Sequence, residues 1–431
     1  MTGMLFENID VLRADGTYLS RQYVGIREKH IAWVSEKAPS EDFGERIDGT
    51  NRLLIPGLYN AHTHVAMTLM RGYGEELPLQ SWLFDRIFPF EDKLYGEAVY
   101  WGSLLGMAEM LSTGTVAFTD MYYFCDETVK AALECGIKAN IGRGISCFDE
   151  SKRFTDLPAY AELKELIASF HGTEDGLIRI DVAPHAEYTT RPDILRDAAA
   201  MAGEYNVRMQ IHVSETQKEH LECVGRHGMT PAALLEQTGV LEHPLTVAHG
   251  VWLTDADMER LARHGATVAH CAKSNLKLGC GIAQTVKMLD KGIHVAIGTD
   301  SAASNNTLDM LDEMRVAGLV AKGISCDPAA LSANTLLYCA GRSGALSQGR
   351  EDCGDITEGY RADLVMLDKN DIGMCPNHAP LSNLLYGAGS RAVRMTVVDG
   401  RILYRDGAFL TMDIEKIRYE VQRCNDQILK M

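Results

Sequence analysis

LTVAHGVWLTDADMERLARHGATVAHC, residues 245–271, contains the repeating unit that decides the fold. Its two ends, LTVAHG and ATVAHC, are short apolar runs with β-branched residues, which is typical of buried strands. Between them lies the helical stretch TDADMERLARHG, which ends at a Gly, a common helix stop. Strand, helix and strand in this order predict neighbouring parallel strands.

The same unit recurs in both directions along the chain. Candidate strands lie at 58–62, 115–120, 137–144, 178–185, 207–213, 245–250, 266–271 and 294–300. Eight such units over roughly 300 residues predict an α/β protein with a (β/α)8 barrel of the TIM type. A doubly wound open sheet is the competing fold, but no GxGxxG motif follows the first strand.

Both ends of the chain have a sequence pattern that differs from the alternating pattern of the middle. LFENIDVLR and YVGIREKHIAWVSE near the start, and ADLVMLD and RMTVVDG near the end, are strand-like runs between turn residues. We therefore expect a small β-sandwich module from residues 1–56 plus 360–431, and a hydrolase barrel from residues 57–359. The tail, 413–431, has the pattern of an amphipathic helix within the terminal module.

Composition excludes several classes of function. The chain carries 42 basic and 59 acidic side chains, a net charge of -17, without a basic run. This argues against a nucleic-acid polymer or an anionic membrane surface as partner. Eleven cysteines without a CxxC pair predict reduced thiols and a cytoplasmic protein. The N-terminal stretch has no signal-peptide pattern, and no run is apolar enough to span a membrane.

Polar residues stand where the barrel strands end, which is the rim that holds active sites in such barrels. His62 and His64 form an H-x-H pair, and on a strand two residues this far apart face the same side. His212 ends another strand, and Glu215 follows it as a candidate general acid and base. Imidazoles on one side of a barrel mouth predict a divalent metal site.

Two further strand ends extend this pattern. Asp300, in IGTDSAASNN, ends an apolar strand, and a buried carboxylate needs a metal or hydrogen-bond donors. His249, in TVAHGV, could be a ligand, a partner of a metal-bound water or a packed core histidine. His62, His64, His212 and Asp300 already supply four ligands, which favours the water-partner role for His249.

Together, PGLYNAHTH, HVSET, AHGV, SNLKLG and GTDSAASNN resemble the amidohydrolase superfamily. Within it, the chain resembles the branch of methylthioadenosine/S-adenosylhomocysteine deaminases and chlorotriazine hydrolases. The resemblance implies one metal ion held by His62, His64, His212 and Asp300, with Zn expected and Fe or Mn compatible. It also implies that Asp300 takes a proton from the attacking water, that His249 holds this water and that Glu215 protonates the ring.

The resemblance further implies the substrate contacts. Glu91 matches an acid that binds ribose hydroxyls, Trp82 an aromatic of the pocket wall and His185 a residue beside the purine. Arg143, with Arg153 less securely aligned, matches arginines that contact the carboxylate of S-adenosylhomocysteine. Lys273 and Glu187 depart from the pattern and are expected to place charges at the pocket rim.

These matches predict hydrolytic deamination of an adenosine-type nucleoside to the inosine analogue and ammonia. S-adenosylhomocysteine, 5′-methylthioadenosine, 5′-deoxyadenosine and adenosine all stay open as substrates. An amidohydrolase acting on a free base or an s-triazine is the alternative enzyme, and a metal-stabilised scaffold is the alternative of another class. The partner is a small molecule, and a homo-oligomer is compatible with the resemblance.

Overall fold

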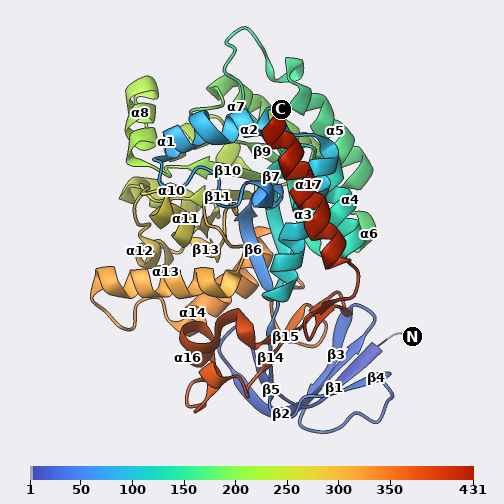
Figure 1. Ribbon diagram of the computed structural model, residues 1–431. Helices are drawn as coiled ribbons and strands as arrows, with labels where there is room; N and C mark the ends of the chain where they lie inside the picture. Colours follow the sequence, from blue (N-terminus) through green and yellow to red (C-terminus); the bar gives the residue numbers. More distant parts are fainter. Residues whose placement is uncertain (1–2) are drawn as a thin grey trace.

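The computed structural model describes residues 3–431, and eight of its strands form a parallel barrel (Figure 1). The strands follow one another around the barrel in chain order, as the alternating pattern predicted. Their bounds are β6 (Leu58–Thr63), β7 (Thr115–Tyr122), β8 (Lys138–Ile145), β9 (Ile178–Pro184), β10 (Met209–Val213), β11 (Leu245–His249), β12 (Thr267–His270) and β13 (His294–Ile297).

Side-chain and main-chain bonds join the last barrel strand to the first. Beyond β13, the amide of Asp300 donates to the carbonyl of His62 at 3.0 Å. Asn60 exchanges two hydrogen bonds with Thr299, at 2.7 and 3.0 Å. These bonds fix Asp300 beside the H-x-H pair, although the two segments lie at opposite ends of the barrel sequence.

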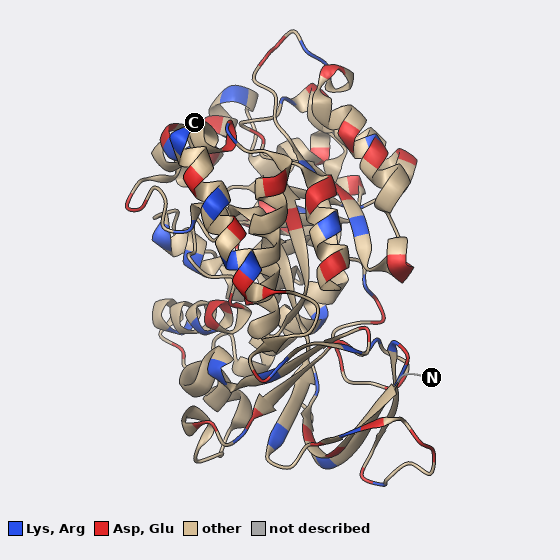
Figure 2. Cartoon of the chain, turned by 45° about the vertical axis from the view of Figure 1, so that its right-hand side comes forward, with Lys and Arg blue, Asp and Glu red and all other residues tan. Residues whose placement is uncertain are grey.

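Helices surround the barrel, and Figure 2 shows acidic and basic residues intermixed along them. Both signs interspersed on an outer surface favour solubility. The main helices are α3 (Gly96–Ser112), α4 (Cys125–Cys135), α5 (Pro158–Phe170), α7 (Pro192–Tyr205), α8 (Gln217–His227), α9 (Pro231–Gln237), α10 (Asp255–Arg263), α11 (Ala272–Lys277), α12 (Thr285–Asp290), α13 (Met310–Ser325) and α14 (Ala333–Tyr338). From residue 3 onward, none is both long and apolar enough to cross a membrane.

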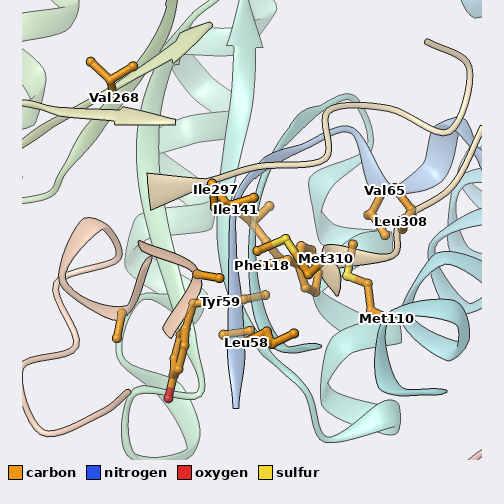
Figure 3. Close-up of a cluster of buried hydrophobic side chains, with 14 of the residues drawn as sticks. Leu58, Tyr59, Val65, Met110, Phe118, Ile141, Val268, Ile297, Leu308 and Met310 are labelled. Carbon is orange, nitrogen blue, oxygen red and sulfur yellow. The ribbon is translucent and has the colours of Figure 1, made fainter. Parts of the chain in front are cut away.

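The core lies between the strands and this helical layer (Figure 3). Phe118 of β7 and Ile141 of β8 belong to the same buried cluster as Met110 of α3, and all three side chains are fully buried. Burying large apolar side chains contributes about 1.5–3 kcal/mol each. This cluster makes the barrel a rigid support for the residues at its rim.

The two ends of the chain form one further sheet. Its strands are β1 (Gly3–Leu12), β2 (Tyr18–Arg27), β3 (His30–Ser35), β4 (Glu45–Asp48), β5 (Arg52–Pro56), β14 (Leu364–Asp368), β15 (Val393–Val398), β16 (Arg401–Arg405) and β17 (Ala408–Phe409). In this sheet β5 lies between β1 and β14, so the early and late segments are paired directly. The sheet has its own apolar core, which includes Phe6, Ile26 and Met395.

A buried ion cluster joins the sheet to the barrel. Lys138, at the start of β8, pairs with Asp363 and Asp399, and the hydroxyl of Tyr59 donates to Asp363. All four side chains are buried. Charges this deep are tolerated only when they are paired, so this cluster fixes how the base of the barrel meets the terminal sheet.

The C-terminal helix α17 (Ile414–Lys430) forms where the amphipathic pattern predicted a helix. It lies along the barrel beside α3 (Figure 1), where Arg423 pairs with Glu97 at 2.5 Å. Its buried residues Cys424 and Ile428 belong to the same apolar cluster as Trp82. The helix therefore supports the segment that forms one wall of the barrel mouth.

Candidate metal centre and active site

Four predicted ligands converge at the carboxyl ends of the barrel strands. His62 and His64 come from β6 and the residue just after it, His212 from β10, and Asp300 from the turn after β13. The Nε2 atoms of His64 and His62 lie 3.3 and 3.7 Å from Oδ1 of Asp300. Nε2 of His64 lies 3.4 Å from Nε2 of His212. Ligand atoms about 2.0–2.1 Å from a tetrahedral metal are separated by about 3.3 Å, so these three spacings are compatible with one ion. The ligand atoms of His62, His64 and Asp300 lie within 4.8 Å of one another, and so do those of His62, His212 and His249.

The hydrogen bonds of these histidines direct their Nε2 atoms to the shared point. Nδ1 of His64 donates to the carbonyl of Met121 at 2.5 Å, and Nδ1 of His212 donates to the carbonyl of His185 at 2.6 Å. A proton held on Nδ1 leaves the Nε2 lone pair free for a metal. Nε2 of His62 is buried and has no hydrogen-bond partner among the described residues. An orphaned buried nitrogen costs about 1–3 kcal/mol, and a divalent metal would satisfy it.

The two carboxylate oxygens of Asp300 have different partners. Its Oδ2 accepts hydrogen bonds from Ser274 at 2.5 Å and Ser304 at 2.8 Å, while Oδ1 faces the imidazoles. Burial opposes the charged form, yet the nearby imidazoles of His249, His64 and His62 hold the pKa of Asp300 well below its usual value. Its φ of +58° is strained for a non-glycine residue, as is common at functional sites.

Glu215 and His249 lie on the cavity side of the cluster. Oε2 of Glu215 is 3.9 Å from Nε2 of His249. Nδ1 of His249 donates to Oδ1 of Asn275 at 2.8 Å, which fixes the tautomer and turns Nε2 toward the cavity. The thiol of Cys280 donates to Oε1 of Glu215 at 3.4 Å. Burial raises the pKa of Glu215, which suits a group that both carries and releases a proton.

Several residues that form these contacts were not predicted from the sequence. Ser274 and Asn275 stand in the motif SNLKLG, and Ser304 stands in GTDSAASNN, so both motifs contained the signal. Glu219 accepts hydrogen bonds from the amides of Ser214 and Glu215 at 2.7 and 2.8 Å, and so shapes the loop that carries Glu215. Thr216 and Glu219 form a T-x-x-E capping box, a local pattern that predicts the start of α8 but not the contacts of Glu219 with the amides of Ser214 and Glu215.

A cavity opens from the metal-ligand cluster, and three predicted substrate contacts line it. Trp82 comes from α1 (Leu79–Trp82), Glu91 from α2 (Phe88–Glu91) and His185 from the end of β9. Burial raises the pKa of Glu91 to about 7, against the opposing effect of the Tyr122 hydroxyl. Nδ1 of His185 is 2.9 Å from the Thr189 hydroxyl, which fixes the ring at the cavity wall.

The two predicted arginines lie elsewhere. Arg143 lines an adjacent hollow, where its Nε donates to Glu162, its Nη1 donates to the carbonyl of Gly144 at 2.6 Å and its guanidinium covers the ring of Tyr123. Arg153 is 78% exposed and pairs with Asp156 at 3.5 Å in a surface turn. The structure therefore brings Arg143 near the site and leaves Arg153 in solvent.

The expectation that Lys273 and Glu187 place charges at the cavity rim is wrong. Lys273 pairs with Asp312 at 2.6 Å, and Glu187 pairs with Arg226 of α8 at 2.5 Å. Neither side chain belongs to the cavity wall. Each charge is neutralised by a partner on a neighbouring helix, which the sequence alone does not reveal.

A TIM-type barrel with three imidazoles, an aspartate and a buried glutamate at its mouth is the architecture of a metal-dependent hydrolase. The model of the amidohydrolase family matches residues 53–403, and the chain belongs to this family.

Relatives and solved structures agree with this assignment. The chain is 39% identical over 429 residues to a 5-methylthioadenosine/S-adenosylhomocysteine deaminase of Dictyoglomus thermophilum, covering 99% of both chains. It is 39% identical over 427 residues to a 5′-deoxyadenosine deaminase of Methanosphaera stadtmanae, covering 98% of this chain and 100% of the relative. The crystal structure of a zinc-bound adenosine deaminase from Xanthomonas campestris superimposes with a TM-score of 0.93 at 31% identity, covering 100% and 99% of the two chains.

Proposed function

We propose that this chain hydrolytically deaminates an adenosine-type nucleoside, giving the inosine analogue and ammonia. The observation that carries this proposal is the position of the two buried carboxylates. Asp300 faces the imidazoles of His62 and His64, and Glu215 lies 3.9 Å from Nε2 of His249. Asp300, Glu215 and His249 line a cavity that also contains Glu91. Two carboxylates beside a metal can move the protons of a hydrolysis. The named activities of the relatives support the same reaction class.

His62, His64, His212 and Asp300 would hold one divalent ion, and we propose Zn, with Fe and Mn compatible with the same donors. When bound, such an ion lowers the pKa of water toward neutrality and so supplies a nucleophile. The contacts of Nδ1 with Met121 and His185 keep the ligand rings in place. The serine hydroxyls on Asp300 likewise leave only Oδ1 to face the centre.

Side chains of the protein then accept and donate the protons of the reaction. Oδ1 of Asp300 accepts a proton from the attacking water, and Nε2 of His249 orients this water. Glu215, whose pKa is raised by burial, delivers a proton to the ring nitrogen beside the carbon that bears the amino group. Asn275 keeps the proton of His249 on Nδ1, so that Nε2 is free to accept a hydrogen bond from the water.

Glu91 supports a nucleoside over a free base. It lines the same cavity as Glu215 but comes from α2, outside the barrel strands. A carboxylate can accept hydrogen bonds from two vicinal hydroxyls, which a ribose has and a free base or s-triazine lacks. Trp82 and His185 supply flat surfaces for the purine.

A substrate panel tests the proposal. Zn-loaded protein is incubated with 5′-methylthioadenosine, 5′-deoxyadenosine, S-adenosylhomocysteine, adenosine, guanine and a chlorotriazine, and ammonia release is followed with the ultraviolet change from adenine to hypoxanthine. We expect turnover of the adenosines. Activity on guanine or the triazine alone would leave the metal centre in place and overturn the substrate assignment.

A further inference from the structure

A second hollow of about 890 Å³ adjoins the catalytic cavity. It lies among α2, α4 and α5 above the end of β8, and it shares Phe88, Glu91, Tyr123 and Ser146 with the cavity. If the proposed function holds, the purine lies at Glu215 and the ribose at Glu91. The group on the 5′ carbon then extends past Glu91 into this hollow.

The hollow has a surplus of negative charge. Its wall contains two basic residues, Lys130 and Arg143, and five acids, which are Glu91, Asp92, Asp126, Glu162 and Glu165. Burial raises the pKa of Glu91 to about 7, so the other four acids carry most of the negative charge. Lys130 is already paired, with Asp126 at 3.5 Å and Glu127 at 2.7 Å. Among residues 3–431, no basic side chain forms an ion pair with Asp92 or Glu165. A ligand carboxylate entering this wall meets repulsion from several acids.

Arg143 is the second of the two basic residues that line this wall in the described part of the chain, and it is also engaged. Its Nε donates to Glu162 of α5, its Nη1 donates to the carbonyl of Gly144, and its guanidinium carbon lies 4.8 Å from the ring centre of Tyr123. The Arg143 side chain is only 15% exposed, whereas Glu162 is 47% exposed. A ligand carboxylate would have to displace Glu162 or share the guanidinium with a second negative charge.

We infer that this hollow selects against anionic 5′ substituents, and that Glu162 determines this specificity by withholding Arg143 from a ligand carboxylate. The hollow accepts neutral groups against its apolar residues Phe88, Phe148 and Phe170. It favours cationic groups because of its unpaired acids. Glu162 acts through Arg143 and through the charge of the wall, and it does not reach the metal centre.

Three 5′-thioethers of adenosine test the inference, each with a short chain that ends in an ammonium, a hydroxyl or a carboxylate group. For the Zn-loaded enzyme, kcat/KM is measured by ammonia release and Kd by calorimetry. We expect the ammonium compound to be the best and the carboxylate compound to be about 10-fold worse than the hydroxyl compound, mainly through KM. A carboxylate compound as good as the hydroxyl compound would overturn the inference.

The Glu162→Gln variant tests the role of the residue. We expect it to improve kcat/KM for the carboxylate compound about 10-fold and to leave the hydroxyl compound within about twofold. Glu204→Gln, an exposed acid on α7, is the matched control and should change neither. An unchanged or poorer carboxylate compound in Glu162→Gln would overturn the role of Glu162.

The two readouts separate this inference from the proposed function. If the thioethers bind in the expected order of charge but release no ammonia, the charge selection stands and the deaminase proposal fails. If all three release ammonia with equal kcat/KM and equal Kd, the deaminase proposal stands and the charge selection is overturned.

Discussion

Replacing Glu215 by Gln removes a proton carrier from the site and keeps its shape. In the structure Oε1 of Glu215 accepts from the thiol of Cys280, and Oε2 lies 3.9 Å from Nε2 of His249. An amide preserves the first contact through its own oxygen but cannot deliver a proton. Positioned acid–base groups contribute about 10²–10⁴-fold to rate, so kcat should fall by that factor, or about 3–5 kcal/mol of activation free energy.

The assay combines three measurements on Glu215→Gln and on the parent. Ammonia release gives kcat, elemental analysis gives the metal content, and thermal unfolding gives Tm. Because Glu215 is not among the four predicted ligands, we expect one metal per chain in both proteins and similar Tm values. Glu222→Gln, on the outer face of α8 and 49% exposed, is the control and should keep full activity. A kcat within threefold of the parent, or a loss of metal from the variant, would refute the assigned role.

Three other perturbations follow from the described contacts. Glu91→Gln should lower kcat/KM for adenosine-type nucleosides about 10-fold, because the amide loses one charged acceptor for the ribose hydroxyls; an equal loss on a free base would contradict the ribose contact. Lys138→Met should reduce the free energy of unfolding by about 3–5 kcal/mol, since Asp363 stays buried without its cation while Asp399 keeps only Arg361 as a partner; urea titration measures this, and a change under about 1 kcal/mol would count against the buried cluster. Chelation should abolish turnover and lower Tm, and Zn should restore both; turnover that survives proven metal removal would disprove the metal centre.

The barrel could be predicted because two features of the sequence indicate its strands. Each strand is a short apolar run, and several end in a residue that is costly to bury without a partner, such as His212 or Asp300. Periodicity located the strands to within a few residues. The rule that parallel strands share one edge then brought distant residues such as His62 and Asp300 to the same place.

Side-chain partners were harder to predict, because they depend on which surfaces the helices present to one another. Arg143 was expected to face a ligand, but α5 brings Glu162 against it. Arg153 lies in a segment without strand or helix periodicity, so the sequence did not show which way its side chain points. In the structure it pairs with Asp156, three residues away, and does not line the cavity. Lys273 pairs with Asp312 of α13. This contact depends on how the helices pack around the barrel, which the sequence pattern does not show.

The pairing of β5 with β14 has a consequence for biosynthesis. Leu53 and Leu367 lie side by side in the terminal sheet although roughly 300 residues separate them in the chain. At about 5–20 residues per second, the ribosome needs roughly 15–60 s to make the intervening barrel. During that interval the early strands present an open hydrogen-bonding edge and an uncovered apolar face, the features that invite aggregation. The growing chain would therefore be most dependent on chaperones while its barrel is being synthesised.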